Sequence, residues 1–481
     1  MTKKKILLLL GIALLISQLF FGQDPQTKVL CVTVVIALWW IFEVLPLGVT
    51  ALLPVVAFPM LDIMPAKKVA PIYMSHIMMV FIGGFLVAGA MERWNLHRRI
   101  ALKIISSFSG TPSKLFLGFM AATAFLSMWI PNTATTVMMV SVSLAVSKHY
   151  EEKFGRDQNS RFFTSALMIS IAYAASIGGI ATLVGTPPNL AFVRIYEIVF
   201  PGVQAPSFAQ WMLFALPTSL ILLTLAWFII CRVFLRSAHL ATLDSSVVKN
   251  ELQKLGKMTA EEKKVSIVFL AMIFLWIFRR DVPLGAFTVP GWGSLIAPPG
   301  VINDGTVAII CALSLFALPS EQGGKLLDKK AFSKIPLEII FLFGGGFALA
   351  KGIQESGLSE SIGEALQFLG HYPEWIITLG ITFTMTFLTE FTSNTSTTEL
   401  FLPIVGSVSK EIGMPPLSLM IPTTLAASCA FMLPAATPPN SIIFASGRVK
   451  VSDMIKCGLI LNLLCVGIIT ILGCLLPLFL P

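Results

Sequence analysis

Residues 389–398 read TEFTSNTSTT, and residues 127–136 read SMWIPNTATT. Both stretches put polar residues in the middle of long apolar segments, at residues 373–409 and 112–147. The shared polar positions keep one spacing (394 − 132 = 262): Asn132, Thr133, Thr135 and Thr136 match Asn394, Thr395, Thr397 and Thr398. Polar groups and irregular backbone are tolerated inside a bilayer where they line a cavity or are covered by protein. We therefore expect each stretch to form the tip of a re-entrant helical hairpin.

The repeat extends beyond the two tips. A glycine-containing block recurs at the same spacing: Phe81, Gly83, Gly84, Phe85 and Ala88 match Phe343, Gly345, Gly346, Phe347 and Ala350. The sequence Thr-Pro-Pro-Asn at 186–189 recurs at 437–440, where a loop deletion shortens the spacing (437 − 186 = 251). Because two consecutive prolines remove two backbone donors, we expect a helix break at each copy. Five spans and one hairpin in each copy would insert the second copy upside down, the inverted-repeat plan of secondary transporters.

The composition excludes a water-soluble domain. Of 481 residues, 56% are hydrophobic and 12% are charged, whereas soluble domains carry about 25% charged residues. The net charge of +9 suggests nucleic acid or a membrane surface as partner, but Lys and Arg lie in short loops between apolar runs. We therefore expect membrane lipids and no nucleic acid as partners. Seven cysteines and five histidines show no metal-ligand or redox spacing, so we expect no cofactor and no enzyme active site.

An all-α polytopic membrane protein with about eleven transmembrane helices and two re-entrant hairpins is predicted. The spans lie near residues 6–21, 28–44, 47–61, 77–95, 162–199, 209–235, 264–279, 303–318, 336–357, 416–446 and 453–480. The first run follows Lys3 to Lys5 and has the basic start of a secretory signal, but no small-residue cleavage site follows it. The Lys and Arg excess of alternate loops places the N-terminus in the cytoplasm and the C-terminus outside. Arg279 and Arg280 are the exception, and Asp281 is their expected partner.

The repeat divides the chain into four segments. They are an extra N-terminal helix (1–27), a first inverted repeat (28–237), a cytoplasmic linker (238–263) and a second inverted repeat (264–481). Thr259 and Glu262 have the spacing of a capping box, which predicts a helix start at the end of the linker.

The two tips and the two breaks are candidate half-sites. Free helix N-termini and hydroxyls hold anions, and unwound carbonyls coordinate hard cations such as Na⁺. Neither motif pair contains Arg or Lys, so a carboxylate would be held by neutral dipoles and a co-bound cation. The alternative is that the hydroxyls only satisfy neighbouring backbone, and that Gly83 and Gly84 only permit close helix packing.

Two carboxylates lie near the second tip. Glu390 and Glu399 are candidates for ion ligands or relays, because intramembrane carboxylates are usually functional. Their counterparts in the first repeat are Met128 and Val137, so we keep both outside the core site.

The sequence resembles the divalent anion/sodium symporter family, the dicarboxylate carriers often called INDY proteins, over nearly the whole chain. The residues that carry the resemblance are Ser393-Asn394-Thr395, the near copy Pro131-Asn132-Thr133 and the two Thr-Pro-Pro-Asn breaks. The resemblance implies a homodimer that carries succinate-like dianions with Na⁺ by an elevator motion of a transport domain against a scaffold.

The resemblance also assigns site residues. The substrate-binding residues it implies are Asn132, Thr133, Asn394 and Thr395, with Thr186, Pro187, Thr437 and Pro438 closing the site. The Na⁺ ligands it implies are Ser127, Asn132 and Gly185 for one ion, and Thr389, Ser393, Asn394 and Ala436 for the other. This chain departs from the family at Pro131, where a serine is expected, which removes a hydroxyl and a backbone donor.

Sodium-coupled symport of C4-dicarboxylates such as succinate, fumarate and malate across a bacterial inner membrane is the hypothesis we prefer. The alternatives are a sodium-independent dicarboxylate exchanger, a carrier of another dianion such as citrate or sulfate, and a membrane-embedded enzyme or sensor. No nucleophile, general-base pair or metal cluster in the sequence supports an enzyme.

Overall fold

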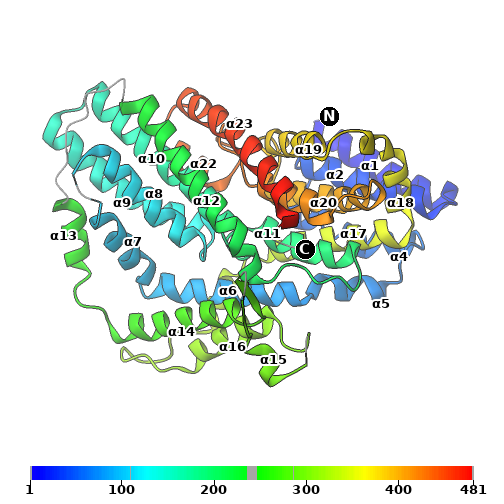
Figure 1. Ribbon diagram of the computed structural model, residues 1–481, viewed down its shortest axis with the longest axis horizontal. Helices are drawn as coiled ribbons and strands as arrows, with labels where there is room; N and C mark the ends of the chain where they lie inside the picture. Colours follow the sequence, from blue (N-terminus) through cyan, green and yellow to red (C-terminus); the bar gives the residue numbers. More distant parts are fainter. Residues whose placement is uncertain (1–2, 109, 236–245, 285–286, 299, 479–481) are drawn as a thin grey trace.

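The computed structural model describes residues 3–108, 110–235, 246–284, 287–298 and 300–478. Helices make up nearly all of the regular structure in these ranges (Figure 1). The exception is one antiparallel ribbon of β1 (Val282–Leu284) and β2 (Phe287–Val289), which the sequence did not predict. The prediction of a helical membrane protein is therefore confirmed.

Six helical segments of the described chain are long and apolar enough to cross a bilayer. They are α1 (Lys3–Phe21), Ala66–Arg93, α10 (Gln158–Ile180), Phe208–Leu235, α17 (Leu337–Glu355) and Val451–Leu478. Shorter apolar segments are α2 (Pro25–Ile41), Leu47–Met60, α16 (Asp304–Ala317), α19 (Glu374–Leu388) and α21 (Pro416–Ala426). The chain is thus a multi-pass membrane protein.

Several of these segments are built from more than one element. Their parts are α3 (Leu47–Thr50), α4 (Leu53–Met60), α5 (Ala66–Val69), η1 (Ala70–Met74), α6 (His76–Arg93), α12 (Phe208–Ile230), the π-helical turn η2 (Cys231–Leu235), α23 (Val451–Leu475) and η5 (Leu476–Leu478). The remaining helices are α7 (Leu96–Ser106), α13 (Ser246–Lys254), α14 (Ala260–Ile277), α15 (Gly293–Ile296), η3 (Lys329–Lys334), α18 (Leu358–Ala365) and η4 (Gln367–His371).

Both polar stretches form the turn of a helical hairpin. The first joins α8 (Pro112–Ser127) to α9 (Asn132–Phe154), and the second joins α19 to α20 (Asn394–Glu411). After each hairpin the next apolar segment breaks at the Thr-Pro-Pro-Asn sequence, as the prolines predict. Helix α10 stops at Ile180 and α11 (Pro187–Val199) follows, while α21 stops at Ala426 and α22 (Pro438–Ala445) follows.

The two breaks have the same backbone geometry. Thr186 precedes α11 with φ −144° and ψ 143°, and Thr437 precedes α22 with φ −141° and ψ 152°. In both, a proline occupies the first helical position, where its missing N–H and fixed φ cost nothing. The repeat in the sequence is therefore also a repeat in local structure.

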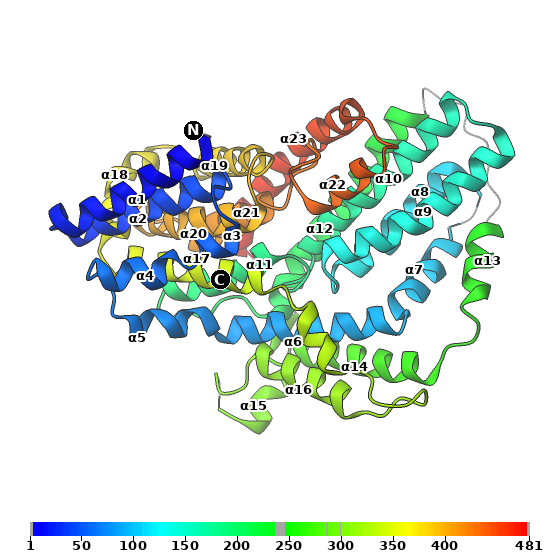
Figure 2. The same ribbon diagram turned by 180° about the vertical axis from the view of Figure 1, so that it is seen from behind.

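The glycine helix of each repeat packs on a helix of the other repeat. Helix α6 lies against α16, and α17 lies against α3 and η1 (Figure 1 and Figure 2). A methyl group on Gly83 would lie 2.6 Å from the Ala308 backbone, and one on Gly345 would lie 2.5 Å from the Ala51 carbonyl oxygen. Glycine is needed at both positions because any side chain would push the paired helices apart.

The helices form two groups. We call α8–α12 and α19–α23 the hairpin bundle, and α1–α6 with α14–α17 the frame. Within the hairpin bundle, α9 packs on α22 and α11 packs on α20, so each hairpin touches the half-helix of the other repeat. The frame meets the bundle where α17 contacts α11 and α20, and where α14 contacts α12.

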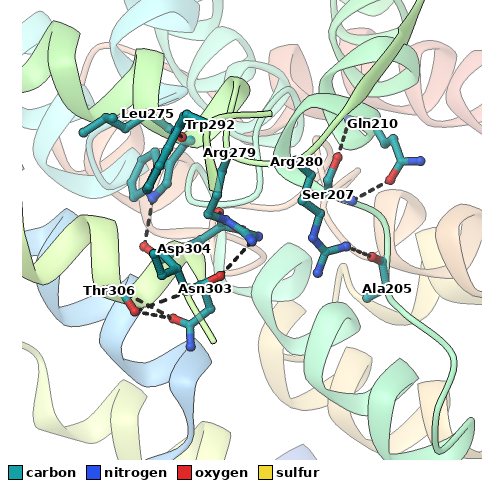
Figure 3. A network of polar contacts seen from close by, with 12 residues as sticks. Ala205, Ser207, Gln210, Leu275, Arg279, Arg280, Trp292, Asn303, Asp304 and Thr306 are labelled. Atoms are coloured by element: carbon teal, nitrogen blue, oxygen red, sulfur yellow. Dashed lines mark hydrogen bonds and ion pairs between the residues drawn. The ribbon is translucent and has the colours of Figure 1, made fainter. Parts of the chain in front are cut away.

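The loop between α14 and α16 corrects one expectation. The Arg279 guanidinium pairs with Asp304 at 2.5 Å and donates to the Ile302 carbonyl at 3.1 Å, rather than pairing with Asp281 (Figure 3). Arg280 donates to the Ala205 carbonyl at 3.1 Å. The Asp281 carboxylate instead accepts from the Gly291 N–H at 2.7 Å, because the chain turns back on itself before α15.

The predicted linker lies partly outside the described residues, which resume at residue 246. Its last turn has the predicted capping box, in which Thr259 and Glu262 exchange side-chain and backbone hydrogen bonds at the start of α14. Arg99 on α7 also pairs with Glu262 at 2.7 Å, and Arg98 pairs with Glu251 at 2.7 Å. The linker is therefore fastened to α7 by two ion pairs.

Candidate functional site

The first hairpin tip is closed by a contact between the ends of its two helices. The Ser127 hydroxyl donates to the Asn132 side-chain oxygen in a short hydrogen bond. Thr136, one turn into α9, donates to the Asn132 carbonyl oxygen at 2.7 Å. The Ser127 contact holds the Asn132 side chain, and the Thr136 contact holds its backbone, at the N-terminus of α9.

The second tip repeats both contacts. The Thr389 hydroxyl donates to the Asn394 side-chain oxygen at 2.6 Å, and Thr398 donates to the Asn394 carbonyl oxygen at 2.7 Å. Each partner is 262 residues beyond its counterpart in the first tip. The two halves therefore present the same asparagine in the same setting, although Ser127 is replaced by threonine.

Each break is held by the asparagine that ends its motif. The Asn189 amide donates to the carbonyl oxygens of Gly179 at 3.2 Å and Thr182 at 2.7 Å. The Asn440 amide donates to the carbonyl oxygens of Ala430 at 3.2 Å and Leu433 at 3.0 Å, again 251 residues later. Neither asparagine was predicted as a site residue, although the repeated Thr-Pro-Pro-Asn motif that contains them was a signal for both.

Each tip is attached to the break of its own repeat. Thr182 donates to the Met128 carbonyl at 2.5 Å. The Thr389 hydroxyl lies 2.9 Å from the Ala427 carbonyl oxygen, so its one proton is shared between this oxygen and that of Asn394. A methyl group placed on Gly179 would lie 2.8 Å from the Asn132 side-chain oxygen and 3.1 Å from the Gly185 carbonyl oxygen. Asn132 and Gly185 therefore converge over Gly179.

The oxygen atoms gathered in this way suit a hard cation. Near the first tip, Ser127, Asn132 and the Gly185 carbonyl come together, and near the second tip Thr389 meets Asn394 directly after Ser393. Hydroxyl, amide and carbonyl oxygens are ligands that Na⁺ accepts in transporters with broken helices. Ala436, the remaining predicted ligand, donates its N–H to the Leu433 carbonyl at 3.2 Å. The assignment of individual Na⁺ ligands stays a prediction.

Four helix N-termini carry the predicted substrate-binding residues. Asn132 and Asn394 are the first residues of α9 and α20, Thr133 and Thr395 are the second, and Pro187 and Pro438 begin α11 and α22 after Thr186 and Thr437. Free N–H groups and the helix dipole make the N-termini of α9 and α20 favourable for an anion. Helices α11 and α22 begin with two prolines, so they offer the dipole without those two N–H groups. Thr395, Thr186 and Thr437 are buried, whereas Thr133 and Pro438 are exposed. These residues also stay predictions as substrate ligands.

Glu390 braces the second break. One carboxylate oxygen accepts from the backbone N–H of Phe431 at 2.7 Å, the N–H of Met432 at 2.9 Å and the Asn462 amide at 2.7 Å. The other oxygen accepts from the Leu433 N–H at 3.0 Å. Both oxygens are occupied by the protein itself, so a structural role is favoured over that of ion ligand or relay. The first repeat has Met128 here, which explains why comparing the halves did not reveal this role.

Pro131, where the family resemblance predicts a serine, gives the first tip the same backbone as Ser393 gives the second. It precedes α9 with φ −50° and ψ 136°, while Ser393 precedes α20 with φ −70° and ψ 130°. The Pro131 carbonyl accepts from the Thr135 N–H at 3.1 Å, just as the Ser393 carbonyl accepts from Thr397 at 2.9 Å. The substitution therefore removes one hydroxyl and one N–H and leaves the hairpin intact.

A multi-pass helical bundle with two repeat-related hairpin tips, each attached to a broken helix, defines a membrane transporter rather than an enzyme. The chain belongs to the family described as the sodium:sulfate symporter transmembrane region, whose model matches residues 5–480. This confirms the family resemblance seen in the sequence.

Relatives and a solved structure agree with this assignment. The chain is 39% identical over 472 residues to the "Sodium-dependent dicarboxylate transporter SdcS" of Staphylococcus saprophyticus, covering 96% of this chain and 88% of the relative. It is 40% identical over 469 residues to the protein of the same name from Staphylococcus aureus strain USA300, covering 95% and 88%. The YdaH transporter of Alcanivorax borkumensis shares the fold, with a TM-score of 0.57, 12% identity and coverage of 84% of this chain and 85% of that one.

Proposed function

We propose that this chain is a sodium-dependent transporter of C4-dicarboxylates. The observation that carries the proposal is the pair of matching tip contacts, Ser127 with Asn132 and Thr389 with Asn394. Two equivalent polar tips suit a substrate with two carboxylates and a cation beside each. Relatives named sodium-dependent dicarboxylate transporters, at 39% and 40% identity over nearly the whole chain, support the same function.

The transport cycle in this proposal is an elevator motion. The hairpin bundle carries the substrate and the Na⁺ ions, and it slides against the frame between two end states. The repeats are inverted, the N-terminus is cytoplasmic and the C-terminus lies outside. The segments are those predicted from the sequence, and two chains associate through their frames as a homodimer. The packing of α9 on α22 and of α11 on α20 supports movement of the hairpins and half-helices as one unit.

Uptake into proteoliposomes tests the function directly. We expect labelled succinate to accumulate with an inward Na⁺ gradient and to stay at the background level with an equal K⁺ gradient. Equal uptake in K⁺, increased by succinate loaded inside, would instead make the chain a sodium-independent exchanger. No uptake of succinate, together with uptake of labelled citrate or sulfate, would assign another dianion. Binding without any uptake would assign a sensor.

Restoring the serine at Pro131 tests the first cation site. We expect Pro131→Ser to lower the Na⁺ concentration for half-maximal uptake by about three- to tenfold, because one added hydroxyl ligand contributes on the order of 1 kcal/mol. The reverse change in the second tip, Ser393→Ala, should raise the same concentration. An unchanged Na⁺ dependence in both variants would remove the hydroxyls of these two positions from the cation sites.

A further inference from the structure

Glu399 is a buried carboxylate that the proposed transport cycle does not use. It lies on α20 with none of its surface exposed, and neither carboxylate oxygen has a hydrogen-bond partner among the described residues. Its carboxylate lies over Gly346 of α17, where an added methyl group would be 2.5 Å from the Glu399 carboxylate carbon. The absence of a side chain at Gly346 is therefore what makes room for the carboxylate.

The charged groups of the neighbouring elements do not neutralise Glu399. Tyr73 of η1 faces it and is close enough to interact with it electrostatically, but the Tyr73 hydroxyl donates to the Ala51 carbonyl at 2.6 Å. The other titratable or charged groups on α2, α11, α17, α18 and α20 are Lys28, Cys31, Arg194, Tyr196, Glu197, Glu338, Lys351, Glu355, Glu360, Glu364, Lys410 and Glu411. The nearest in sequence to Gly346 is Lys351, which instead pairs with Glu355 at 3.5 Å. A buried carboxylate without a cation or a donor is far costlier than the neutral acid.

A cleft approaches this position from one side. It has a volume of about 40 Å³, and the residues that line it include Glu360, Lys410, Glu411, Ala350 and Pro403. Ala350 and Pro403 each lie one helical turn beyond Gly346 and Glu399. The polar cleft therefore comes within about one helical turn of the buried carboxylate.

Glu399 lies at the contact between α20 and α17, and the equivalent contact in the first repeat, between α9 and α6, is different. Its counterpart Val137 on α9 is 52% exposed, and α6 and α9 pack far less closely than α17 and α20 do among the described residues. Gly84, the counterpart of Gly346, has an ordinary contact to Trp276 at 3.8 Å and no carboxylate over it. In the opposite end state, the inverted repeat would exchange these environments. Helix α20 would then leave α17, and Glu399 would take the exposed setting that Val137 has here.

We propose that Glu399 is a proton-binding site that must be filled before α20 can pack against α17. The inference rests on the proposed elevator cycle. Water in the cleft supplies the proton when α20 is separated from α17, and Glu399 then enters the contact as a neutral carboxylic acid. When the contact opens, the acid can ionise and return the proton to water. Transport is therefore faster at low pH, whatever the charge on the substrate.

The pH dependence of fumarate uptake tests the site, because fumarate stays a dianion between about pH 6 and pH 9. With a fixed Na⁺ gradient, we expect uptake by the unmodified protein to fall by up to about tenfold per pH unit once Glu399 ionises. Glu399→Gln, which mimics the neutral acid, and Glu399→Val, which copies the first repeat, should show nearly constant uptake. Glu364→Gln, at an exposed carboxylate on α18, should behave like the unmodified protein.

Infrared difference spectroscopy of the purified protein gives a readout that does not depend on transport. We expect a protonated carboxylic acid band at neutral pH that is absent in Glu399→Gln and present in Glu364→Gln. The same band in all proteins, or an unchanged pH profile in Glu399→Gln, would overturn the proposal. A missing band with a shifted Na⁺ requirement in Glu399→Gln would make Glu399 a cation ligand instead. If no protein takes up fumarate, the proposed function fails, while the infrared band still decides the state of Glu399.

Discussion

Asn132→Ala and Asn394→Ala should each lower dicarboxylate uptake by about a hundredfold or more. Each asparagine begins a hairpin helix, receives the hydroxyl of Ser127 or Thr389, and is proposed to contact both substrate and Na⁺. A hydrogen bond to a charged group contributes about 1.5–3 kcal/mol, so losing two such contacts accounts for the expected effect. Initial rates of succinate uptake into proteoliposomes measure it.

The control for these variants is Asn250→Ala, at an exposed position on α13. It should retain full uptake, and all three proteins should elute from a size-exclusion column at the same volume. A misfolded Asn132→Ala or Asn394→Ala protein would show that the asparagine side chains only hold the hairpins together. Normal uptake by a folded variant would remove that tip from the substrate site.

Glu390→Gln should produce the largest loss of stability among the variants considered. The carboxylate accepts four hydrogen bonds, three of them from consecutive backbone N–H groups of the second break. Glutamine has one accepting oxygen in place of two, so buried donors are left without a partner, at a cost of about 3–5 kcal/mol. The apparent melting temperature in detergent should fall steeply, and uptake should be lost because the break no longer holds its shape.

The comparison with Glu364→Gln separates this effect from a general loss of negative charge. That variant should keep the melting temperature of the unmodified protein. If Glu390→Gln kept both its melting temperature and its Na⁺-driven uptake, the carboxylate would not brace the break. Unchanged stability with altered pH dependence would return Glu390 to the role of a relay.

Local features of the fold were predictable from the sequence because they are caused by local chemistry. The hairpin turns and the two helix breaks follow from polar clusters and paired prolines within apolar segments, and the repeat identified equivalent positions. The packing of α6 on α16 and of α17 on α3 was not predictable, because the Gly83 and Gly345 blocks show that close approach occurs but not which helix approaches. The β-ribbon was missed because three-residue strands carry little pattern.

In the candidate site, too, some features were predictable from the sequence and others were not. The asparagines of the tips were found because both copies of the repeat contain them. The bracing role of Glu390 and the isolation of Glu399 were not found. Their counterparts in the first repeat are Met128 and Val137, and comparing the halves gives no information about positions where the halves differ. The true partner of Arg279 is Asp304, which is too distant in sequence for a neighbouring-charge argument to identify.

Helices α6 and α17 each pack on a helix of the other repeat, and this has a consequence for biogenesis. When Gly83 leaves the ribosome, the Ala308 backbone that will cover it lies 225 residues (308 − 83) further along the chain and has yet to emerge. At about 5–20 residues per second, α6 waits roughly 10–45 seconds for its partner. During that interval lipid or an insertion chaperone must shield its glycine face. In a chain truncated after the first repeat, that face would stay uncovered. We therefore expect cellular quality control to degrade such a chain.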